Sequence, residues 1–290
     1  MNADKAVLSY PRLSAFICGL RPHEWLFIGY FTYVAVVAGW YFTPWKAWLL
    51  AAIVATILAA LSRTRSVFRD VFPLALMLTA YREMNWFAPN RYDHHLENGW
   101  VVWDHWLLND NHVRAGIESL GALLPTYFEL CYLLVYAVGS VALLLLFCNG
   151  SWNRVNLFWM VYLAGTLGAY ALFPYFPSEP PRTVFATVDL PHIITVVRRF
   201  NLWILGGYSI HSSVFPSAHV SSAFSAAWAL LVTVPQRKWI GGLMAFYAVS
   251  VAVATIYGRY HYAADAVAGL AVSFAGLVAI NSYSPQDQKR

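Results

Sequence analysis

Residues 216–265 read PSAHVSSAFSAAWALLVTVPQRKWIGGLMAFYAVSVAVATIYGRYHYAAD and contain two long apolar runs with a histidine at each outer end. His219 opens the first run, and His261 follows the second run 42 residues later. An α-helix rises about 1.5 Å per residue, so about twenty residues cross a hydrocarbon core of about 30 Å. The chain therefore crosses the membrane and returns, which predicts that both histidines lie at the same membrane face.

The composition of the chain also indicates a membrane protein. Of the 290 residues, 59% are hydrophobic and 11% are charged, less than half of the about one quarter that is typical of soluble domains. A mean hydropathy of +0.52 excludes a disordered chain and an ordinary cytosolic enzyme. The net charge of +5 comes from dispersed basic residues, so we expect a lipid bilayer as partner and no nucleic acid. The cysteines lie in or beside apolar runs and predict no disulfide framework, at Cys18, Cys131 and Cys148.

Eight apolar runs have the length and composition of membrane spans. Backbone groups in hydrocarbon must be paired within their own segment, so each run is predicted as an α-helix and the fold class as all-α integral membrane. The third run is interrupted by Arg82 and Glu83, and a half-buried helix is the alternative there. The runs lie at roughly 25–42, 45–62, 70–87, 125–147, 154–174, 215–235, 239–258 and 262–282.

The basic residues predict the orientation of these spans. With the N-terminus inside, eleven Lys and Arg residues fall in the shorter inner segments and eight fall in the longer outer segments. This bias favours cytoplasmic termini in a multi-pass protein of a bacterial inner or plasma membrane. The first twenty-four residues lack a clean apolar core and contain Pro11 and Pro22, so we expect no cleavable signal peptide.

We expect one membrane domain over residues 1–290, with an appended two-helix hairpin in segment 1–69, and two long outer loops. In the first loop, 88–124, aromatic and apolar residues recur at helical spacing and predict an outer interfacial helix at 98–122, a conceivable gate for lipid entry. These residues are Trp100, Trp103, Trp106 and Leu107. The second loop, 175–214, is expected to have no apolar face of its own.

Three polar clusters interrupt the apolar pattern, all at the outer edge of the last five spans. They are FPSEPPR at 176–182, PSAH at 216–219 and GRYHYAAD at 258–265. Their positions predict that they meet at one membrane depth, where ionisable groups are costly and usually functional.

The residue types in these clusters suit phosphoryl transfer without a metal or a cofactor. Asp265 stands four residues after His261 on one helix face, where its carboxylate can accept the Nδ1–H and leave Nε2 free as a nucleophile. His219 can protonate the leaving oxygen as a general acid. Arg182 and Arg259 offer donors to phosphoryl oxygens, and Ser217 with the first amides of its helix offers an anion site.

Each of these residues also has a structural interpretation. A single interfacial histidine is more often a polar residue reaching the surface, the His261–Asp265 pair can be a satisfied hydrogen bond, and the arginines can anchor headgroups. The Ser-, Ala- and Gly-rich runs after His219 and around Asp265 predict close helix packing. This packing would also bring the two histidines within reach of each other, so the structural and functional interpretations agree.

At these residues the sequence resembles the type-2 phosphatidic acid phosphatase superfamily. The family's first motif ends in an arginine, its second reads P-S-x-H and its third ends in H-x-x-x-D, which correspond here to Arg182, residues 216–219 and residues 261–265. The resemblance implies a catalytic six-helix core over 70–282. It also implies His261 as nucleophile, Asp265 as its orienting partner, His219 as acid for the leaving group, and arginines around the phosphate.

The sequence departs from the hydrolase form of these motifs at two positions. Tyr175 stands where the first motif has a lysine, and Thr255 stands where the third has an arginine, for which Arg259 is a candidate substitute. FPSEPPR and RYHYAAD resemble the inositol phosphorylceramide synthase branch, whose members move a phosphorylated headgroup between lipids. We therefore expect an inositolphosphotransferase-like enzyme that uses a lipid phosphate ester and an alcohol acceptor at the outer face.

Three alternatives stay open at this point. A lipid phosphate phosphatase would use water as acceptor, with phosphatidate or a polyprenyl diphosphate as substrate. A transporter would show inverted repeats and broken helices near the midplane, and neither is found. A metal enzyme would need ligands in the first outer loop, but their spacing fits no compact pattern. These candidate ligands are Asp93, His94, His95, His105 and His112.

Overall fold

The structure is a computed structural model, and it describes residues 19–64 and 66–283. Within this part of the chain every regular element is helical, and none is a strand. The chain forms two compact units, Met1–Phe72 and Pro73–Arg290. Cys18 and the basic residues predicted for the cytoplasmic ends before residue 19 and after residue 283 lie outside the described residues.

The first unit contains the predicted hairpin of α2 (Pro22–Ala38) and α3 (Trp45–Leu61), followed by α4 (Val67–Val71). A buried ion pair ties α4 to α2, because the Arg69 guanidinium donates from Nε and Nη2 to both Glu24 carboxylate oxygens at 2.7 and 2.6 Å. Arg21 and Asp70 form a second pair beside it. Forked pairs of this kind are the strongest form of carboxylate–guanidinium contact.

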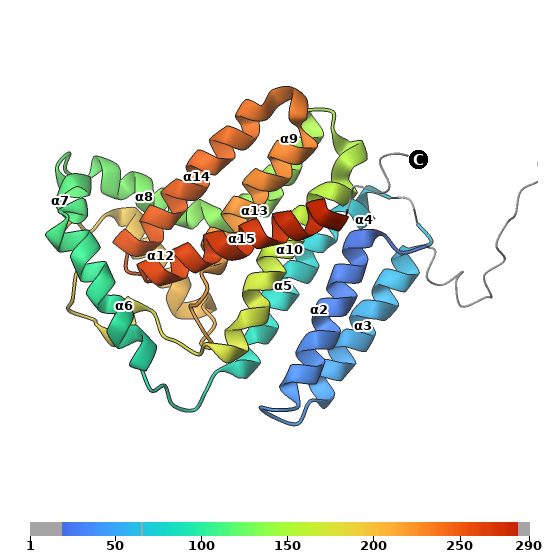
Figure 1. Ribbon diagram of the computed structural model, residues 1–290, viewed down its shortest axis with the longest axis horizontal. Coiled ribbons are helices and arrows are strands. Elements are labelled where there is room, and N and C mark those ends of the chain that lie inside the picture. Colours follow the sequence, from blue (N-terminus) through green and yellow to red (C-terminus); the bar gives the residue numbers. More distant parts are fainter. Residues whose placement is uncertain (1–18, 65, 284–290) are drawn as a thin grey trace, which may run out of the picture. The chain divides into compact units, whose positions relative to one another are not determined.

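The second unit is a bundle of helices whose boundaries follow the apolar runs (Figure 1). Its long elements are α8 (Leu123–Leu134), continued by a 3-10 turn into α9 (Val138–Cys148), then α10 (Val155–Leu172), α13 (Ala218–Thr233), α14 (Lys238–Tyr257) and α15 (Ala263–Tyr283). Among the described residues, four helical stretches are long and apolar enough to cross a membrane. These stretches are Leu123–Cys148, Trp152–Tyr175, Pro235–Tyr257 and Ala263–Ser282.

The predicted span at 70–87 is wrong as a single helix. The chain there is divided between α4, which ends at Val71, and α5 (Pro73–Glu83), which begins at a proline. Proline lacks an amide hydrogen and is tolerated at the first turn of a helix, but it cannot continue one. A 3-10 turn, Met84–Phe87, extends α5, so residues 73–87 rise about 25 Å, which is still short of a hydrocarbon core of about 30 Å.

Small residues allow α13 to pack closely against α10 and α15, as the sequence predicts (Figure 1). A Cβ atom on Gly165 of α10 would lie 2.1 Å from the Ser225 Oγ of α13, and one on Gly269 of α15 would lie 2.5 Å from the Ser217 carbonyl oxygen. The Ser221 hydroxyl donates to the Gly165 carbonyl at 2.9 Å. Backbones in contact at these points bring the first turn of α13 to the first turn of α15.

The first outer loop contains two helices and not the single one predicted at 98–122. These are α6 (His95–His105), extended by a π-helical turn to Asp110, and α7 (Val113–Glu118). His112 separates them with a φ of 56°, a left-handed conformation that no continuous α-helix contains. The tryptophans do not share one face, because Trp103 and Trp106 are exposed while Trp100 stacks on Phe215.

The second outer loop contains α11 (Pro181–Val184) and the amphipathic helix α12 (Val196–Tyr208). The prediction that residues 175–214 have no apolar face is wrong, since Val196, Phe200 and Trp203 form an exposed apolar face on α12. The opposite face of α12 is polar and buried, and it meets a carboxylate within the bundle.

This carboxylate is Glu129 of α8, which is 2% exposed within an otherwise apolar stretch. It accepts hydrogen bonds from the Arg198 guanidinium at 2.8 Å, the Asn201 side-chain amide at 2.7 Å and the Tyr260 hydroxyl at 2.6 Å. Arg198 also donates to the Gly258 carbonyl at 3.0 Å. Glu129 therefore joins α8, α12 and the turn between α14 and α15.

We predict that Glu129→Ala lowers the free energy of unfolding by about 3–5 kcal/mol, because it leaves the Arg198 charge buried without its partner. Thermal unfolding in detergent measures the change. The matched control is Asp93→Ala, which removes a pair with His95 whose side chains are 76% and 69% exposed. That control is expected to have little effect on stability, because an exposed ion pair contributes little. Equal losses in the two variants would contradict a structural role for Glu129.

Candidate active site

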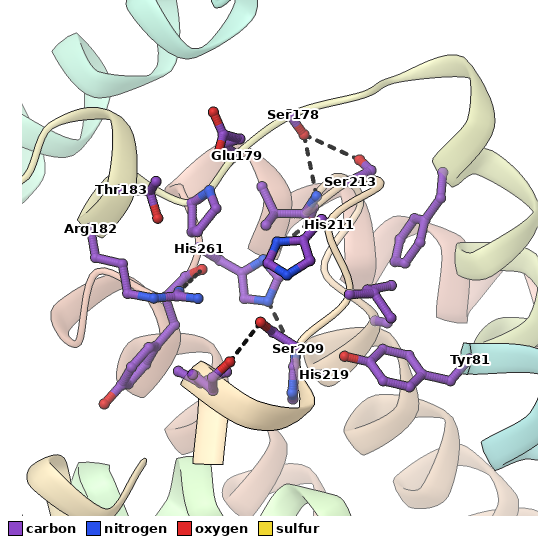
Figure 2. A pocket seen from close by; sticks show the side chains of 18 of the residues that line it. Tyr81, Ser178, Glu179, Arg182, Thr183, Ser209, His211, Ser213, His219 and His261 are labelled. Carbon is purple, nitrogen blue, oxygen red and sulfur yellow. Dashed lines mark hydrogen bonds between the residues drawn. The ribbon is translucent and has the colours of Figure 1, made fainter. Parts of the chain in front are cut away.

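A cavity of about 380 Å³ lies where the outer loops meet the ends of α13 and α14 (Figure 2). Its wall includes both histidines of the polar clusters together with Arg182. Hydroxyl groups from the two segments that cross the cavity, at Ser178, Thr183 and Ser213, also line it. Three clusters that are far apart in the sequence therefore contribute to one cavity.

The two histidines lie side by side, as their spacing predicts. His219 is in the first turn of α13, and His261 is in the turn between α14 and α15. The distance between His219 Nδ1 and His261 Nε2 is 3.2 Å, and the ring centroids are 5.3 Å apart. One ring must donate a hydrogen to the other at this distance.

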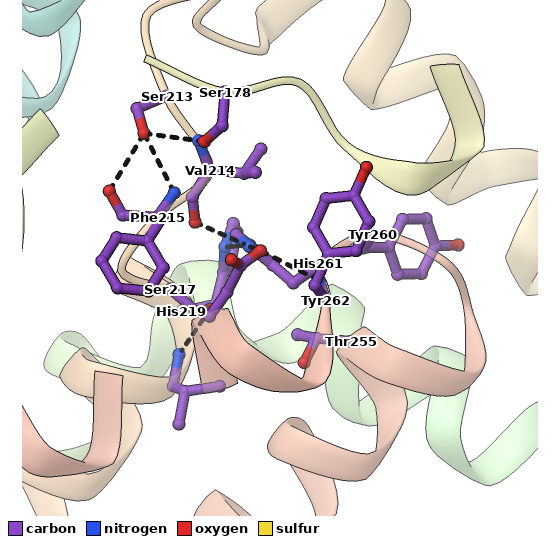
Figure 3. A network of polar contacts seen from close by, with 12 residues as sticks. Ser178, Ser213, Val214, Phe215, Ser217, His219, Thr255, Tyr260, His261 and Tyr262 are labelled. Atoms are coloured by element: carbon purple, nitrogen blue, oxygen red, sulfur yellow. Dashed lines mark hydrogen bonds and ion pairs between the residues drawn. The ribbon is translucent and has the colours of Figure 1, made fainter. Parts of the chain in front are cut away.

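The partners of His261 Nδ1 determine which ring donates (Figure 3). The Val214 carbonyl oxygen lies 3.0 Å from this nitrogen, and the Asp265 Oδ2 lies 3.3 Å from it. A carbonyl only accepts, so Nδ1 of His261 carries the hydrogen and Nε2 of the neutral ring has a free lone pair. His219 therefore donates its Nδ1–H to Nε2 of His261.

The surroundings keep His261 neutral at ordinary pH. The pKa of the His261 imidazole is lowered from 6.5 to about 3, mainly by burial and also by the Arg182 charge, while the Val214 carbonyl opposes the shift. A neutral ring with its hydrogen held on Nδ1 is the form of histidine that acts as a nucleophile.

Asp265 connects the two histidine-bearing segments. Its Oδ2 accepts from the Tyr262 amide at 2.9 Å in addition to facing His261, and its carbonyl oxygen accepts from the Ser217 amide at 2.9 Å. Its other carboxylate oxygen, Oδ1, is buried and has no hydrogen-bond partner among the described residues. Asp265 thus orients the His261 ring and fixes the start of α13, where His219 lies.

Arg182 lies at the cavity wall and is held by the same turn as His261. Its backbone amide donates to the Arg259 carbonyl at 3.2 Å, and its guanidinium donates to the Tyr260 carbonyl at 3.3 Å. The guanidinium carbon is 5.7 Å from the centre of the Tyr260 ring, a cation–π distance. One hydrogen-bonded edge and one aromatic face leave other guanidinium hydrogens available to an anion in the cavity.

Arg259 occupies a different place from the one the sequence suggests. It is fully buried, it pairs with Asp104 of α6, and it is not among the residues that line the cavity. Its backbone has a φ of 59°, a left-handed conformation that costs a residue with a Cβ atom about 1–2 kcal/mol. The Asp104 pair stabilises this conformation, which directs the Arg259 carbonyl to Arg182.

Ser217 is also absent from the cavity wall and acts as the N-cap of α13. Its hydroxyl oxygen accepts from the Val220 amide at 3.3 Å, which satisfies one of the free amides at the start of the helix. The side chain is fully buried, so the anion site expected at this serine is occupied by the protein's own cap.

Sequence reasoning missed three contributors to the site. Asp104 accepts from the Ala263 amide at 2.8 Å and so caps α15 as well as pairing with Arg259. Val214 contributes only a carbonyl group, for which no sequence signal exists. Glu129 was detectable, because a single carboxylate in an apolar run of spanning length is a functional or structural exception.

Three histidines of the first outer loop that were considered as metal ligands each face a carboxylate. His94 faces Glu97, His95 faces Asp93, and His105 faces Asp189, at 3.4, 2.8 and 3.0 Å. Over residues 19–64 and 66–283, no group of three or more His, Cys, Asp or Glu side chains is arranged to hold a metal ion.

Comparison with known proteins gives one match. The family model described as PAP2 superfamily matches residues 101–279, which include His219, His261, Arg182 and Asp265. Searches of curated proteins and of solved structures each returned no match.

We predict that Asp104 and Arg259 act as one unit in positioning Arg182 and His261. Asp104→Ala and Arg259→Ala should each reduce turnover at least tenfold, and the double variant should be little worse than either single one. Coupling of more than about 1 kcal/mol is expected for partners in one buried pair. The measurement is a double-mutant cycle on kcat/KM with an Asp110→Ala control. Additive losses would show that the two residues act independently.

A second prediction concerns pH. Between pH 6.5 and about 3, His261 binds a proton in the unfolded chain but not in the folded protein. This residue therefore lowers the free energy of unfolding as the pH is lowered. Its contribution is at most about 1.4 kcal/mol per pH unit. Thermal unfolding of the wild type and of His261→Gln from pH 7.5 to 4.5 should show a shallower loss in the variant. His192→Gln, at a residue that is 70% exposed, should leave the wild-type slope unchanged.

Proposed function

The chain belongs to the PAP2 superfamily, and we propose that it transfers a phosphorylated headgroup from a lipid phosphate ester to an alcohol through a covalent intermediate on His261. Members of this superfamily are phosphatases or phosphotransferases, and four helices among the described residues have the length and composition of membrane spans. The protein is thus an integral-membrane enzyme of the lipid phosphate type. The observation that supports the finer proposal best is the 3.2 Å approach of His219 to His261 beside Arg182.

The first step forms a bond between His261 Nε2 and phosphorus and breaks the bond from phosphorus to the lipid oxygen. The departing oxygen takes a proton from His219, which acts in its imidazolium form while the anionic substrate is bound. The lipid leaves as an alcohol, and His219 becomes neutral. In the second step an acceptor hydroxyl attacks phosphorus, returns its proton to His219 and breaks the phosphorus–nitrogen bond. His261 regains its lone pair, so both histidines return to their starting forms.

The hydrogen bond between the rings belongs to the resting enzyme. Reacting atoms approach each other to about 3–3.5 Å, so phosphorus cannot lie between two nitrogens that are 3.2 Å apart. Substrate binding must therefore separate the rings. We expect His219 to be the ring that moves, since it packs against the Tyr132 and Tyr136 rings but lacks the carbonyl and carboxylate partners that hold His261 Nδ1.

Arg182 is proposed to bind the phosphoryl oxygens. It is the one arginine among the described residues that line the cavity, and its charge lies beside the proposed nucleophile. Arg259 and Ser217, which were expected to share this role, are engaged by Asp104 and by the α13 amides. We propose for them a supporting role in which they hold the two histidine-bearing turns.

The departures from the hydrolase motifs support transfer to an alcohol over hydrolysis. Thr255, at the position of the family's arginine, is buried in α14, and its hydroxyl donates to the Ala252 carbonyl at 2.8 Å. No second guanidinium among the described residues replaces it at the cavity wall. The wall instead carries hydroxyl groups and Glu179, which suit an acceptor with hydroxyls of its own. A phosphatase that uses water is the alternative, and both would place the site at the outer face.

We predict that His261→Ala abolishes turnover of every phosphate ester, because the nucleophile is lost. His219→Ala should lose about 10²–10⁴-fold with a lipid ester, the range that general acid catalysis contributes. With a nitrophenyl ester of the same phosphate the loss should be much smaller, since that leaving group needs no proton. The measurement is turnover of radiolabelled lipid phosphate mono- and diesters, with trapping of labelled protein.

The control is His192→Ala, which removes an exposed histidine outside the cavity and should keep wild-type turnover. Product analysis with and without added alcohols separates transfer from hydrolysis. Phosphorylated acceptor supports the proposal, whereas free phosphate or phosphorylated headgroup regardless of acceptor supports the phosphatase. Wild-type turnover in His261→Ala would end the covalent mechanism.

A further inference from the structure

Helix α12 has its polar and apolar faces reversed relative to a helix of a soluble protein. Its buried face carries Arg198 and Asn201, both bonded to Glu129. Its exposed face carries Val196, Phe200 and Trp203, which are 80%, 47% and 68% exposed. A helix in water shows the opposite pattern, so the solvent of this face is hydrocarbon or the headgroup boundary.

The length of α12 favours the boundary. Its 13 residues rise about 20 Å, which is too short for a hydrocarbon core of about 30 Å. Aromatic residues such as Trp203 and Phe200 prefer the headgroup layer, and the exposed Arg199 beside them can reach lipid phosphates. The described features of α12 are therefore those of a helix that lies in the membrane interface.

The same helix also forms a wall of the candidate active-site cavity. Leu202, Leu205 and Gly206 of α12 line the cavity that contains His261 and Arg182. In contrast, none of the described residues that line this cavity belongs to α6, although Trp103 and Trp106 are just as exposed. A lipid that enters from the bilayer and follows this cavity to the phosphate site would therefore pass along α12.

Gly206 marks the open part of this wall. Gly206 lines the cavity, and a Cβ atom there meets no atom within 4 Å, so this part of the wall has room for a side chain. Gly207 has the same freedom, but it is not part of the cavity wall. The two neighbouring glycines therefore have the same free space around them, but only Gly206 lies in the cavity wall.

We propose that α12 is the subsite for the hydrocarbon chain of the lipid phosphate. The chain lies against Leu202, Leu205 and Gly206 while its phosphate meets Arg182 and His261, and the exposed face of α12 rests in the interface from which the lipid enters. This inference rests on the proposed function, because it assumes a lipid phosphate ester in the cavity.

The test compares Gly206→Leu with its matched control Gly207→Leu. Both changes replace glycine by leucine in the same helical turn, so their effects on helix propensity are alike. Gly206→Leu should lower kcat/KM at least tenfold for a lipid phosphate with chains of sixteen carbons, mainly through KM. It should change the value less than threefold for a short-chain water-soluble ester. Gly207→Leu should stay within twofold of the wild type on both substrates, and Gly206→Ala should show a smaller loss of the same kind.

Equal losses on both substrates in Gly206→Leu and Gly206→Ala would overturn the proposal, because they would indicate disturbed chemistry. A second measurement does not depend on turnover. A long-chain lipid phosphate with a photoactivatable group on its chain should label the peptide of α12 in wild type and in Gly207→Leu, and the label should fall in Gly206→Leu. Label on α6 in place of α12 would overturn the chain subsite. Label on α12 without turnover of any phosphate ester would keep the subsite and overturn the proposed function.

Discussion

Buried carboxylates hold the turn at residues 258–265 from three sides, and the position of His261 depends on them. A carboxylate that is removed from water needs hydrogen-bond donors or an opposite charge. Each buried carboxylate therefore holds in place the residues that supply its donors. Glu129 accepts hydrogen bonds from the Tyr260 hydroxyl and from Arg198. Asp104 pairs with Arg259 and accepts from the Ala263 amide. Asp265 accepts from the Tyr262 amide. Ring contacts of Tyr260 with Tyr132 and of Tyr262 with Trp100 pack the turn as well, and the Asp104 pair stabilises its left-handed Arg259.

The second requirement of the site is the close approach of two helix ends, which small residues provide. Contacts at Gly165 and Gly269 let α13 meet α10 and α15 at backbone distance. The Ser217 amide then bonds to the Asp265 carbonyl, so the first turns of α13 and α15 have one relative position. The packing of small residues determines the distance between the helices, and the buried carboxylates determine the conformation of the turn at 258–265. Together they determine the separation of the histidine rings.

The sequence predicted those features that depend on length and period. Spans of about twenty residues placed His219 and His261 at one face, and the boundaries of the long helices follow the apolar runs, at α8 with α9, α10, α13, α14 and α15. The predictions that were not met depend on the rotation of a side chain about its helix or on an irregular turn. Spacing placed Arg259 at the correct depth, but only the turn conformation directs its side chain to Asp104 and away from the cavity. Likewise, the tryptophan spacing of residues 100–106 predicted a helix but not its end at Asp110.

The error over α12 has a general physical cause. Arg198 and Arg199 were counted among the basic residues of the outer segments, and residues 175–214 were expected to have no apolar face. In a bilayer the solvent is apolar, so a helix places its charges inward wherever the bundle offers a carboxylate, and Glu129 is such a partner. An enzyme that joins a phosphate group to a lipid chain needs both environments at one cavity. A helix with polar contacts on its inner face and apolar residues on its outer face supplies that boundary, and α12 forms the wall of the cavity where the two environments meet.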